Sequence, residues 1–180
     1  MVSFIDCHLS LRRCSPFNGG KFEGWGTSFC WWPNRIGYLD ELSEQAAKLF
    51  FDSKEGLGLN IIRYNIGGGD DPTHHHITRT DSMVPGYAIN PSHDANGYHW
   101  SYDWNADQNQ RNVLMKVAEC YGKDLIVEGF SNSPPYFMTN SGCSSGSVII
   151  FVRMRMVPLL HILLMLHNIF QKNGASIFRV

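Results

Sequence analysis

Apolar side chains recur along the chain in patterns that predict the order of its strands and helices. Apolar and β-branched runs predict three strands, at residues 22–32, 59–66 and 125–131. The second run, LNIIRYNI, is almost continuous, which predicts a strand buried on both faces of a parallel sheet. The first run ends in FCWW, so we expect it to lead into an aromatic loop.

Two helices are predicted between these strands. The first spans residues 40–51 with Asp40 as its expected N-cap. The second spans residues 107–121, where Asp107 and Gln110 have the spacing of a capping box. The predicted apolar faces consist of Leu42, Ala46, Leu49 and Phe50 in the first helix, and of Val113, Leu114, Val117, Ala118 and Tyr121 in the second.

The order strand, helix, strand, long loop, helix, strand predicts parallel strands joined by right-handed crossovers. The long loop, residues 67–106, is dense in Gly, Pro, Asn, His and aromatic residues, and we expect it to be ordered and functional. Distinctive residues follow each predicted strand, at the edge where a (β/α)8 barrel has its active site. A doubly wound sheet would also bind its ligand there, but the chain contains neither GxGxxG nor GxxxxGK[ST].

Composition excludes several classes of protein. With 43% hydrophobic and 13% aromatic residues, the 180-residue chain is neither wholly disordered nor a fibre. A formal net charge of −1 gives no reason to expect a nucleic-acid partner or an anionic membrane surface. Five cysteines at irregular spacing, without a CxxC pair, argue against a zinc ribbon or a dense disulfide framework.

The acidic residues divide the chain into two parts. All 16 Asp and Glu residues lie between Asp6 and Glu128, whereas the remaining residues, 129–180, contain none. Residues 148–170 are rich in Leu, Ile and Met and have the length of a transmembrane helix. Arginines at two central positions oppose that alternative, because each costs several kcal/mol in a bilayer, so no membrane partner is expected.

The segment Gly67-Gly68-Gly69-Asp70-Asp71 is the first candidate for chemistry. Two carboxylates would repel a phosphate, but their oxygens accept hydrogen bonds from sugar hydroxyls. A plain surface turn is the alternative. The neighbouring run of three histidines, 74–76, invites a metal site, but adjacent side chains diverge, so a solvated loop without metal is expected.

Two further features have both a structural and a functional interpretation. Trp31 and Trp32 are adjacent and cannot both face one core from a strand, so Trp31 is either a platform for a sugar ring or a core residue. Arg63 and Glu128 lie inside predicted strands, where they either pair across the sheet or position a ligand.

Four motifs together resemble glycoside hydrolase family 30, in particular its endo-β-1,6-galactanase-like branch: FEGWGTSFCWWPNRIGY, GLGLNIIRYNIGGGDDP, DWNADQNQRNVL and EGFSNSPPYFMTNSGCSSG. The resemblance runs from about residue 19 to residue 146. It implies a (β/α)8 barrel that hydrolyses β-glycosidic bonds with retention through two glutamates, without a cofactor, on a polysaccharide or oligosaccharide. It also implies that the substrate-binding residues are Trp31, Arg63, Asp70 and Asn132, the last standing where some relatives have a tryptophan.

The chain departs from the family pattern at the catalytic positions. The acid/base glutamate of the family lies in an Asn-Glu-Pro context after the fourth strand, and the nucleophile follows the seventh, whereas all six glutamates here lie at or before the third. We therefore expect the N-terminal part of a barrel, with about three βα units and an unclosed three-stranded sheet, that is inactive by itself. A non-catalytic protein that holds glycan in an aromatic cleft is the alternative.

The resemblance also predicts boundaries, with residues 1–18 outside the family match, 19–146 within it and 147–180 forming an unrelated tail. When the codons of the tail are read one base out of frame, with suitable synonymous codons, they can encode an amino-acid sequence that resembles the family's acidic continuation. A frameshift near codon 147 is our hypothesis for it. Family members are usually secreted, but residues 1–17 do not form a convincing signal peptide because charged residues interrupt them.

Overall fold

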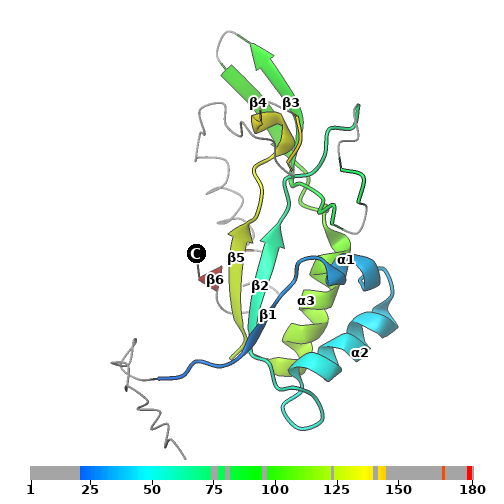
Figure 1. The fold of residues 1–180 in the computed structure, drawn as a ribbon, viewed down its shortest axis with the longest axis vertical. Helices are drawn as coiled ribbons and strands as arrows, with labels where there is room; N and C mark the ends of the chain where they lie inside the picture. Colours follow the sequence, from blue (N-terminus) through cyan, green and yellow to red (C-terminus); the bar gives the residue numbers. More distant parts are fainter. Residues whose placement is uncertain are drawn as a thin grey trace, which may run out of the picture.

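The computed structural model describes residues 21–73, 77–79, 82–94, 97–122, 124–139 and 142–144, together with residues 168, 178 and 179. Its centre is a parallel sheet covered on one side by helices (Figure 1). In sheet order the strands are β1 (Gly26–Ser28), β2 (Ile61–Ile66), β5 (Ile126–Ser131) and β6 (Phe178–Arg179). The helices are α1 (Trp32–Ile36), α2 (Asp40–Phe51), α3 (Gln108–Tyr121) and the short 3-10 helix η2 (Tyr136–Met138).

The sheet has the predicted parallel βαβ order, and it is not closed. β2 pairs in parallel with β1 on one side and with β5 on the other, and Ser28, Arg63 and Glu128 lie in one row across the three strands. One expectation was wrong, since the described sheet has four strands rather than three. β6 comes from the tail and pairs with β5 over two residues, so this edge of β5 is partly covered.

The core lies between the sheet and the helices. Alternate residues of β2, Ile62, Tyr64 and Ile66, point to this side and are at most 1% exposed. They pack in one cluster with Phe29, Ala47, Phe51, Val113, Leu114, Val117 and Val127. Burying each large apolar side chain contributes about 1.5–3 kcal/mol, so this cluster is the main force holding the helices on the sheet.

Burial of β2 on both faces was predicted and holds only in part. Asn65 is 2% exposed, but Arg63, which also points away from the helices, is exposed. In a closed barrel this face is filled by side chains from the other strands. An unclosed sheet leaves it partly open.

Helix α2 has the predicted bounds but faces the core with other residues. Ser43, Ala47 and Phe51 are buried, whereas Leu42 and Leu49 are 37% and 60% exposed. The apolar face of α2 is wider than the area that contacts the core. Packing against α3 determines which side of this face is buried. The N-cap is Leu39, not Asp40, whose carboxylate instead accepts a hydrogen bond from Asn112 of α3.

Helix α3 confirms the predicted apolar face, with Val113, Leu114 and Val117 fully buried. Asp107 is the N-cap residue, but its side chain makes no capping hydrogen bond. It has a left-handed backbone (φ 59°) and its carboxylate accepts from Gln110 and Tyr64 instead. The predicted capping box is therefore wrong, because both side chains turn toward the sheet.

The long loop contains an antiparallel hairpin that the sequence did not predict. Strands β3 (Ala88–Asp94) and β4 (Gly97–Tyr102) pair with a register shift between Ile89 and Ser92, and the hairpin projects beyond the C-terminal ends of β2 and β5 (Figure 1). Trp100 of β4 packs against Phe137 of η2, with ring centroids 6.1 Å apart. This contact fixes the hairpin beside the segment that follows β5.

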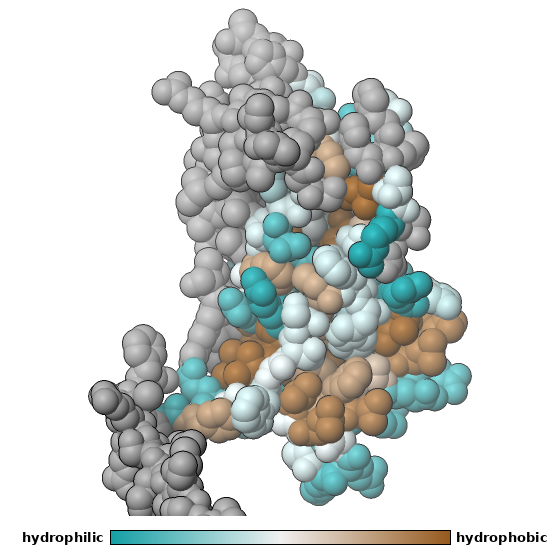
Figure 2. All heavy atoms as spheres, in the orientation of Figure 1, coloured by the Kyte–Doolittle hydropathy of each residue, from teal (hydrophilic) through white to brown (hydrophobic). Residues whose placement is uncertain are grey.

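Apolar side chains gather on the surface near α2 and the beginning of the sheet (Figure 2). Trp25, Leu49 and Leu57 are 60–72% exposed. Within the described residues, no helix is long and apolar enough to cross a membrane. Of the stretch 148–170 that raised this question, only residue 168 is described.

Candidate functional site

Three segments meet the C-terminal edge of the sheet, because β1, β2 and β5 are parallel. Trp31 follows β1, the turn from Gly67 to Asp71 follows β2, and Asn132 follows β5. Backbone contacts join two of these segments, since the amide of Tyr136 donates to the carbonyl oxygen of Gly68 over 3.0 Å.

The two adjacent tryptophans have different environments. Trp32 packs edge-on against Phe29 and Phe50, with centroids 5.2 and 5.3 Å away, and its indole N–H donates to the carbonyl of Ser28. Trp31 is 36% exposed, and the guanidinium of Arg79 lies 5.9 Å from its ring centroid. Trp32 is therefore the core residue, and the ring of Trp31 is partly available at the surface.

Arg63 stacks on an aromatic ring rather than on a carboxylate. Its guanidinium carbon lies 3.6 Å from the centroid of the Phe130 ring. Glu128 is its register partner on β5, yet the two side chains form no ion pair among the described residues. Arg63 is exposed, so its guanidinium remains accessible beside the ring.

Asp70 and Asp71 each bind backbone amides within their own turn. The carboxylate of Asp70 accepts from the amides of Asp71 (2.9 Å) and Ile77 (3.1 Å). One oxygen of Asp71 accepts from both the amide and the hydroxyl of Thr73, at 2.8 and 2.7 Å. These bonds orient the carboxylates, and each Asp70 oxygen accepts one of its two amide donors, which leaves it a lone pair for a further donor.

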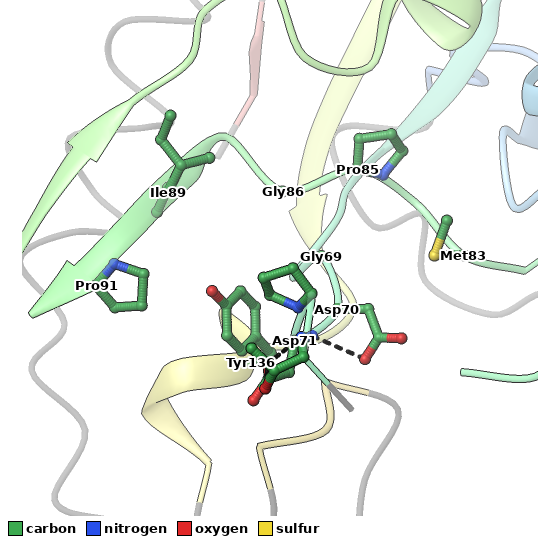
Figure 3. Close-up of a pocket in the computed structure, with 12 residues that line it drawn as sticks. Gly69, Asp70, Asp71, Met83, Pro85, Gly86, Ile89, Pro91 and Tyr136 are labelled. Atoms are coloured by element: carbon green, nitrogen blue, oxygen red, sulfur yellow. Dashed lines mark hydrogen bonds between the residues drawn. The ribbon is translucent and has the colours of Figure 1, made fainter. Parts of the chain in front are cut away.

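A hollow of about 860 Å³ opens beside this turn (Figure 3). The segment from Gly69 to Thr73 forms one side, and Tyr136 of η2 closes another. The remaining side is formed by the segment that leads into β3 together with the first residues of β3. The polar groups near the hollow are the two carboxylates, Thr73 and the phenol, and Pro85, Ile89 and Pro91 supply apolar surface.

Of the four predicted site residues, Asp70 alone lines this hollow. Asn132 is exposed in the bend after β5, Arg63 lies on the sheet itself, and Trp31 lies after β1. The structure thus brings the segments of Trp31, Asp70 and Asn132 to one edge of the sheet. Convergence of all four side chains on one concave face stays a prediction.

Tyr136 was not predicted from the sequence as a candidate. Partial burial, followed by the negative charges of Asp71 and Asp70, raises the pKa of its phenol. The phenol and both carboxylates line the same hollow. The available signal was its place in NSPPYFM, directly after the third predicted strand.

No metal site is found among the described residues, which contain no group of three or more His, Cys, Asp or Glu side chains suited to hold an ion. The three histidines at 74–76 lie outside the described residues, so the expectation of a solvated loop without metal stays a prediction.

Beneath the edge lies a buried polar network that the sequence did not reveal. The hydroxyl of Tyr64 donates to Asp107 (2.7 Å) and lies 3.0 Å from the hydroxyl of Tyr87. The side chain of Gln110 donates to the same Asp107 oxygen. It also donates to the backbone carbonyl of Asn65 and accepts from the backbone amide of Asn65. The network joins β2, α3 and the approach to the hairpin.

Parallel βαβ units in an unclosed sheet match part of a (β/α)8 barrel. Two solved structures share this arrangement. A conserved exported protein from Bacteroides fragilis superposes with a TM-score of 0.66 at 21% identity, over 86% of this chain and 32% of that one. The catalytic domain of the family 30 xylanase C from Talaromyces cellulolyticus gives a TM-score of 0.52 at 16% identity, over 86% and 34%.

Sequence comparison is more specific. The chain is 37% identical over 149 residues to an endo-β-1,6-galactanase of Hypocrea rufa, covering 72% of this chain and 29% of that protein. It is 29% identical over 185 residues to an exo-β-1,6-galactobiohydrolase of Bifidobacterium longum, covering 73% and 12%. No family model matches the chain. The chain is thus a homologue of endo-β-1,6-galactanase, similar to glycoside hydrolase family 30, and it spans less than a third of either relative.

Proposed function

We propose that this chain is the substrate-binding N-terminal part of a retaining glycoside hydrolase that acts on β-linked galactan or a related polysaccharide, and that it is inactive by itself. The observation that supports the proposal is the parallel register of β1, β2 and β5, which brings the segments of Trp31, Asp70 and Asn132 to one edge. Aromatic faces stack on sugar rings, and carboxylates accept hydrogen bonds from hydroxyls.

In this proposal Arg63 and Asp70 hold the sugar next to the scissile bond. The stacking of Arg63 on Phe130 leaves guanidinium N–H groups to donate to ring or hydroxyl oxygens. Asp70 accepts from sugar hydroxyls with the lone pairs that its two amide donors leave. Trp31 and Asn132 would contact the same sugar from the neighbouring strands.

The chemical step needs two carboxyl groups about 5 Å apart on either side of the glycosidic oxygen. Among the glutamates, Glu41 and Glu44 lie on α2 and Glu119 lies on α3, away from the strand ends. Glu128 lies in the middle of β5. Asp70 and Asp71 are adjacent and cannot easily flank one bond, so we propose that no pair here acts as acid and nucleophile.

The test is reducing-sugar release from β-1,6-galactan. The 180-residue chain is compared, at equal folded concentration, with a version in which its residues 19–146 continue into the remaining barrel of the Hypocrea rufa relative. We expect no turnover by the short chain and measurable turnover by the extended one. Turnover by the short chain that Asp70→Ala abolishes would contradict the proposal and indicate a different mechanism.

The partly exposed ring of Trp31 favours one alternative, a carbohydrate-binding protein that retains glycan without cutting it. It predicts that the short chain is retained on immobilised β-1,6-galactan and that the extended version also releases no product. The assay above therefore separates the two functions.

The boundary at residue 147 is part of the proposal. We propose that residues 147–180 arise from a reading-frame change, and the nucleotide sequence near codon 147 tests this directly. The frameshift hypothesis would be excluded by an open reading frame in which no change of one or two bases restores a family-like amino-acid sequence.

A further inference from the structure

We propose that the hollow between the Gly69–Thr73 turn, residues 83–91 and Tyr136 is a second sugar subsite, separate from the one around Trp31 and Arg63. In it, Tyr136 provides the stacking surface and Asp71 accepts hydrogen bonds from hydroxyls. This inference rests on the proposed function, because it assigns a place to a further ring of the same polysaccharide.

The hollow is large enough for a sugar ring, and its lining suits one. Its volume of about 860 Å³ falls within the range of about 300–1,000 Å³ found for small-molecule sites. Pro85, Ile89 and Pro91 form apolar surface, whereas the turn brings carboxylates to another side. A hexose has the same division, with C–H groups on its faces and hydroxyls at its rim. The carboxylates also disfavour an anionic ligand.

The phenol of Tyr136 and the two carboxylates face the same hollow. The charges of Asp71 and Asp70 contribute to raising the pKa of Tyr136, and all three residues line the hollow (Figure 3). A sugar lying on the ring of Tyr136 therefore presents its rim to carboxylate oxygens. Asp71 is oriented for this by the two hydrogen bonds from Thr73.

The walls are held in place by contacts outside the hollow. The Tyr136 amide donates to Gly68, and the hydroxyl of Ser144 donates to the carbonyl of Gly69. A Cβ atom at Gly86 would lie 3.0 Å from the backbone of Gly68 and Gly69, which is tighter than most such contacts, so this close approach favours glycine. Walls that are held by such contacts lower the entropic cost of ordering the site on binding.

The hollow also adjoins the region of Trp31. The side-chain amide of Asn34, in the helix that begins after Trp31, donates to the carbonyl of Met83 over 3.2 Å. Met83 itself lines the hollow. Two rings of one polysaccharide can therefore occupy neighbouring positions along the C-terminal edge of the sheet.

The experiment measures the affinity of the 180-residue chain for galactose and for β-1,6-galactotriose by ligand-observed NMR titration. The variants are Tyr136→Ala, Tyr136→Phe and Asp71→Asn. Tyr38→Ala is the matched control, because Tyr38 is 65% exposed and lies outside the hollow. Trp31→Ala reports on the proposed first position. Circular dichroism spectra confirm that each variant is folded.

We expect Tyr136→Ala and Asp71→Asn to weaken galactotriose binding about tenfold, as for the loss of one stacking or charge-assisted contact. Tyr136→Phe retains the ring and should change the affinity about twofold or less. Galactose should bind these variants as it binds the wild type, since the first position remains intact.

Two other outcomes would contradict the second subsite, and they have different consequences for the proposed function. Galactotriose binding that is weakened by Trp31→Ala, but not by Tyr136→Ala or Asp71→Asn, would exclude the second subsite and keep the proposed function. Absence of binding by the folded wild-type chain to both sugars would exclude the two together.

Discussion

The hydroxyl of Tyr64 donates a 2.7 Å hydrogen bond to Asp107 although both side chains are buried. This bond joins β2 to the N-terminus of α3 across 43 residues. Burial makes the charge of the carboxylate costly, whereas the donors Tyr64 and Gln110 favour it. Burial is the larger effect, and it raises the pKa of Asp107 to about 7.

This pKa predicts that stability falls as the pH rises toward neutrality. The ordinary value of 3.8 lies below the folded-state value, so the folded chain retains a proton that the unfolded chain releases. The contribution is fully present below pH 3.8 and is lost as the pH rises through about 7. It is on the order of a few kcal/mol, and we expect the melting temperature at pH 8 to be roughly 5–10 °C lower than at pH 5.

Asp107→Asn tests this assignment, because the amide is neutral at every pH. We expect the variant to lose the difference in melting temperature between pH 5 and pH 8. Asp124→Asn, a change at an exposed carboxylate, should leave the difference unchanged. A pH dependence that survives in Asp107→Asn would show that another group causes it.

We expect substitution of Trp32 to reduce mainly stability, and substitution of Trp31 to reduce mainly galactan binding. Trp32→Ala removes two edge-on aromatic contacts and an N–H donor, and we expect it to cost about 3 kcal/mol in the free energy of unfolding. Trp31→Ala should cost less than about 1 kcal/mol, because its ring is partly exposed. Urea titration measures both, and retention on galactan should fall for Trp31→Ala alone. Equal destabilisation by the two changes would contradict the assignment of Trp32 to the core.

Arg63 is expected to couple to Phe130 and not to Glu128. A double-mutant cycle with Arg63→Ala and Phe130→Leu should give a coupling free energy of about 0.5–1 kcal/mol, typical of an exposed cation–π pair. The matching cycle with Glu128→Gln should give a coupling near zero, as the two charges form no ion pair in the described structure. A larger coupling to Glu128 would favour pairing across the sheet.

Gln110 is expected to be essential for the packing of α3 on β2. Its side chain accepts from the amide of Asn65 over 3.2 Å and donates to the carbonyl over 2.8 Å. Gln110→Leu leaves both backbone groups buried without these partners, and we expect a loss of about 2–4 kcal/mol in urea titration. Gln108→Leu, at an exposed position on the same helix, should cost less than about 1 kcal/mol. Similar losses for the two variants would exclude a special role of Gln110.

Local patterns in the sequence were sufficient for the elements with strong periodicity. Strands β2 and β5 and helices α2 and α3 lie within two residues of their predicted bounds. The hairpin of β3 and β4 was not predicted because its sequence, AINPSHD followed by GYHWSY, contains a proline and many polar residues. These strands form through pairing with each other and through the contact of Trp100 with Phe137, which no local pattern contains.

What the sequence by itself determined is the βαβ order, the parallel sheet and the similarity to galactanases, because strand and helix periods and long motifs are local properties of the chain. Only the tertiary structure decided which side of each element meets the core. It turned Leu49 outward and Trp32 inward, placed Arg63 on Phe130 rather than on Glu128, and directed Asp107 toward Tyr64. Each of these choices depends on partners distant in the sequence, since a side chain settles where packing and hydrogen bonding with those partners cost least free energy.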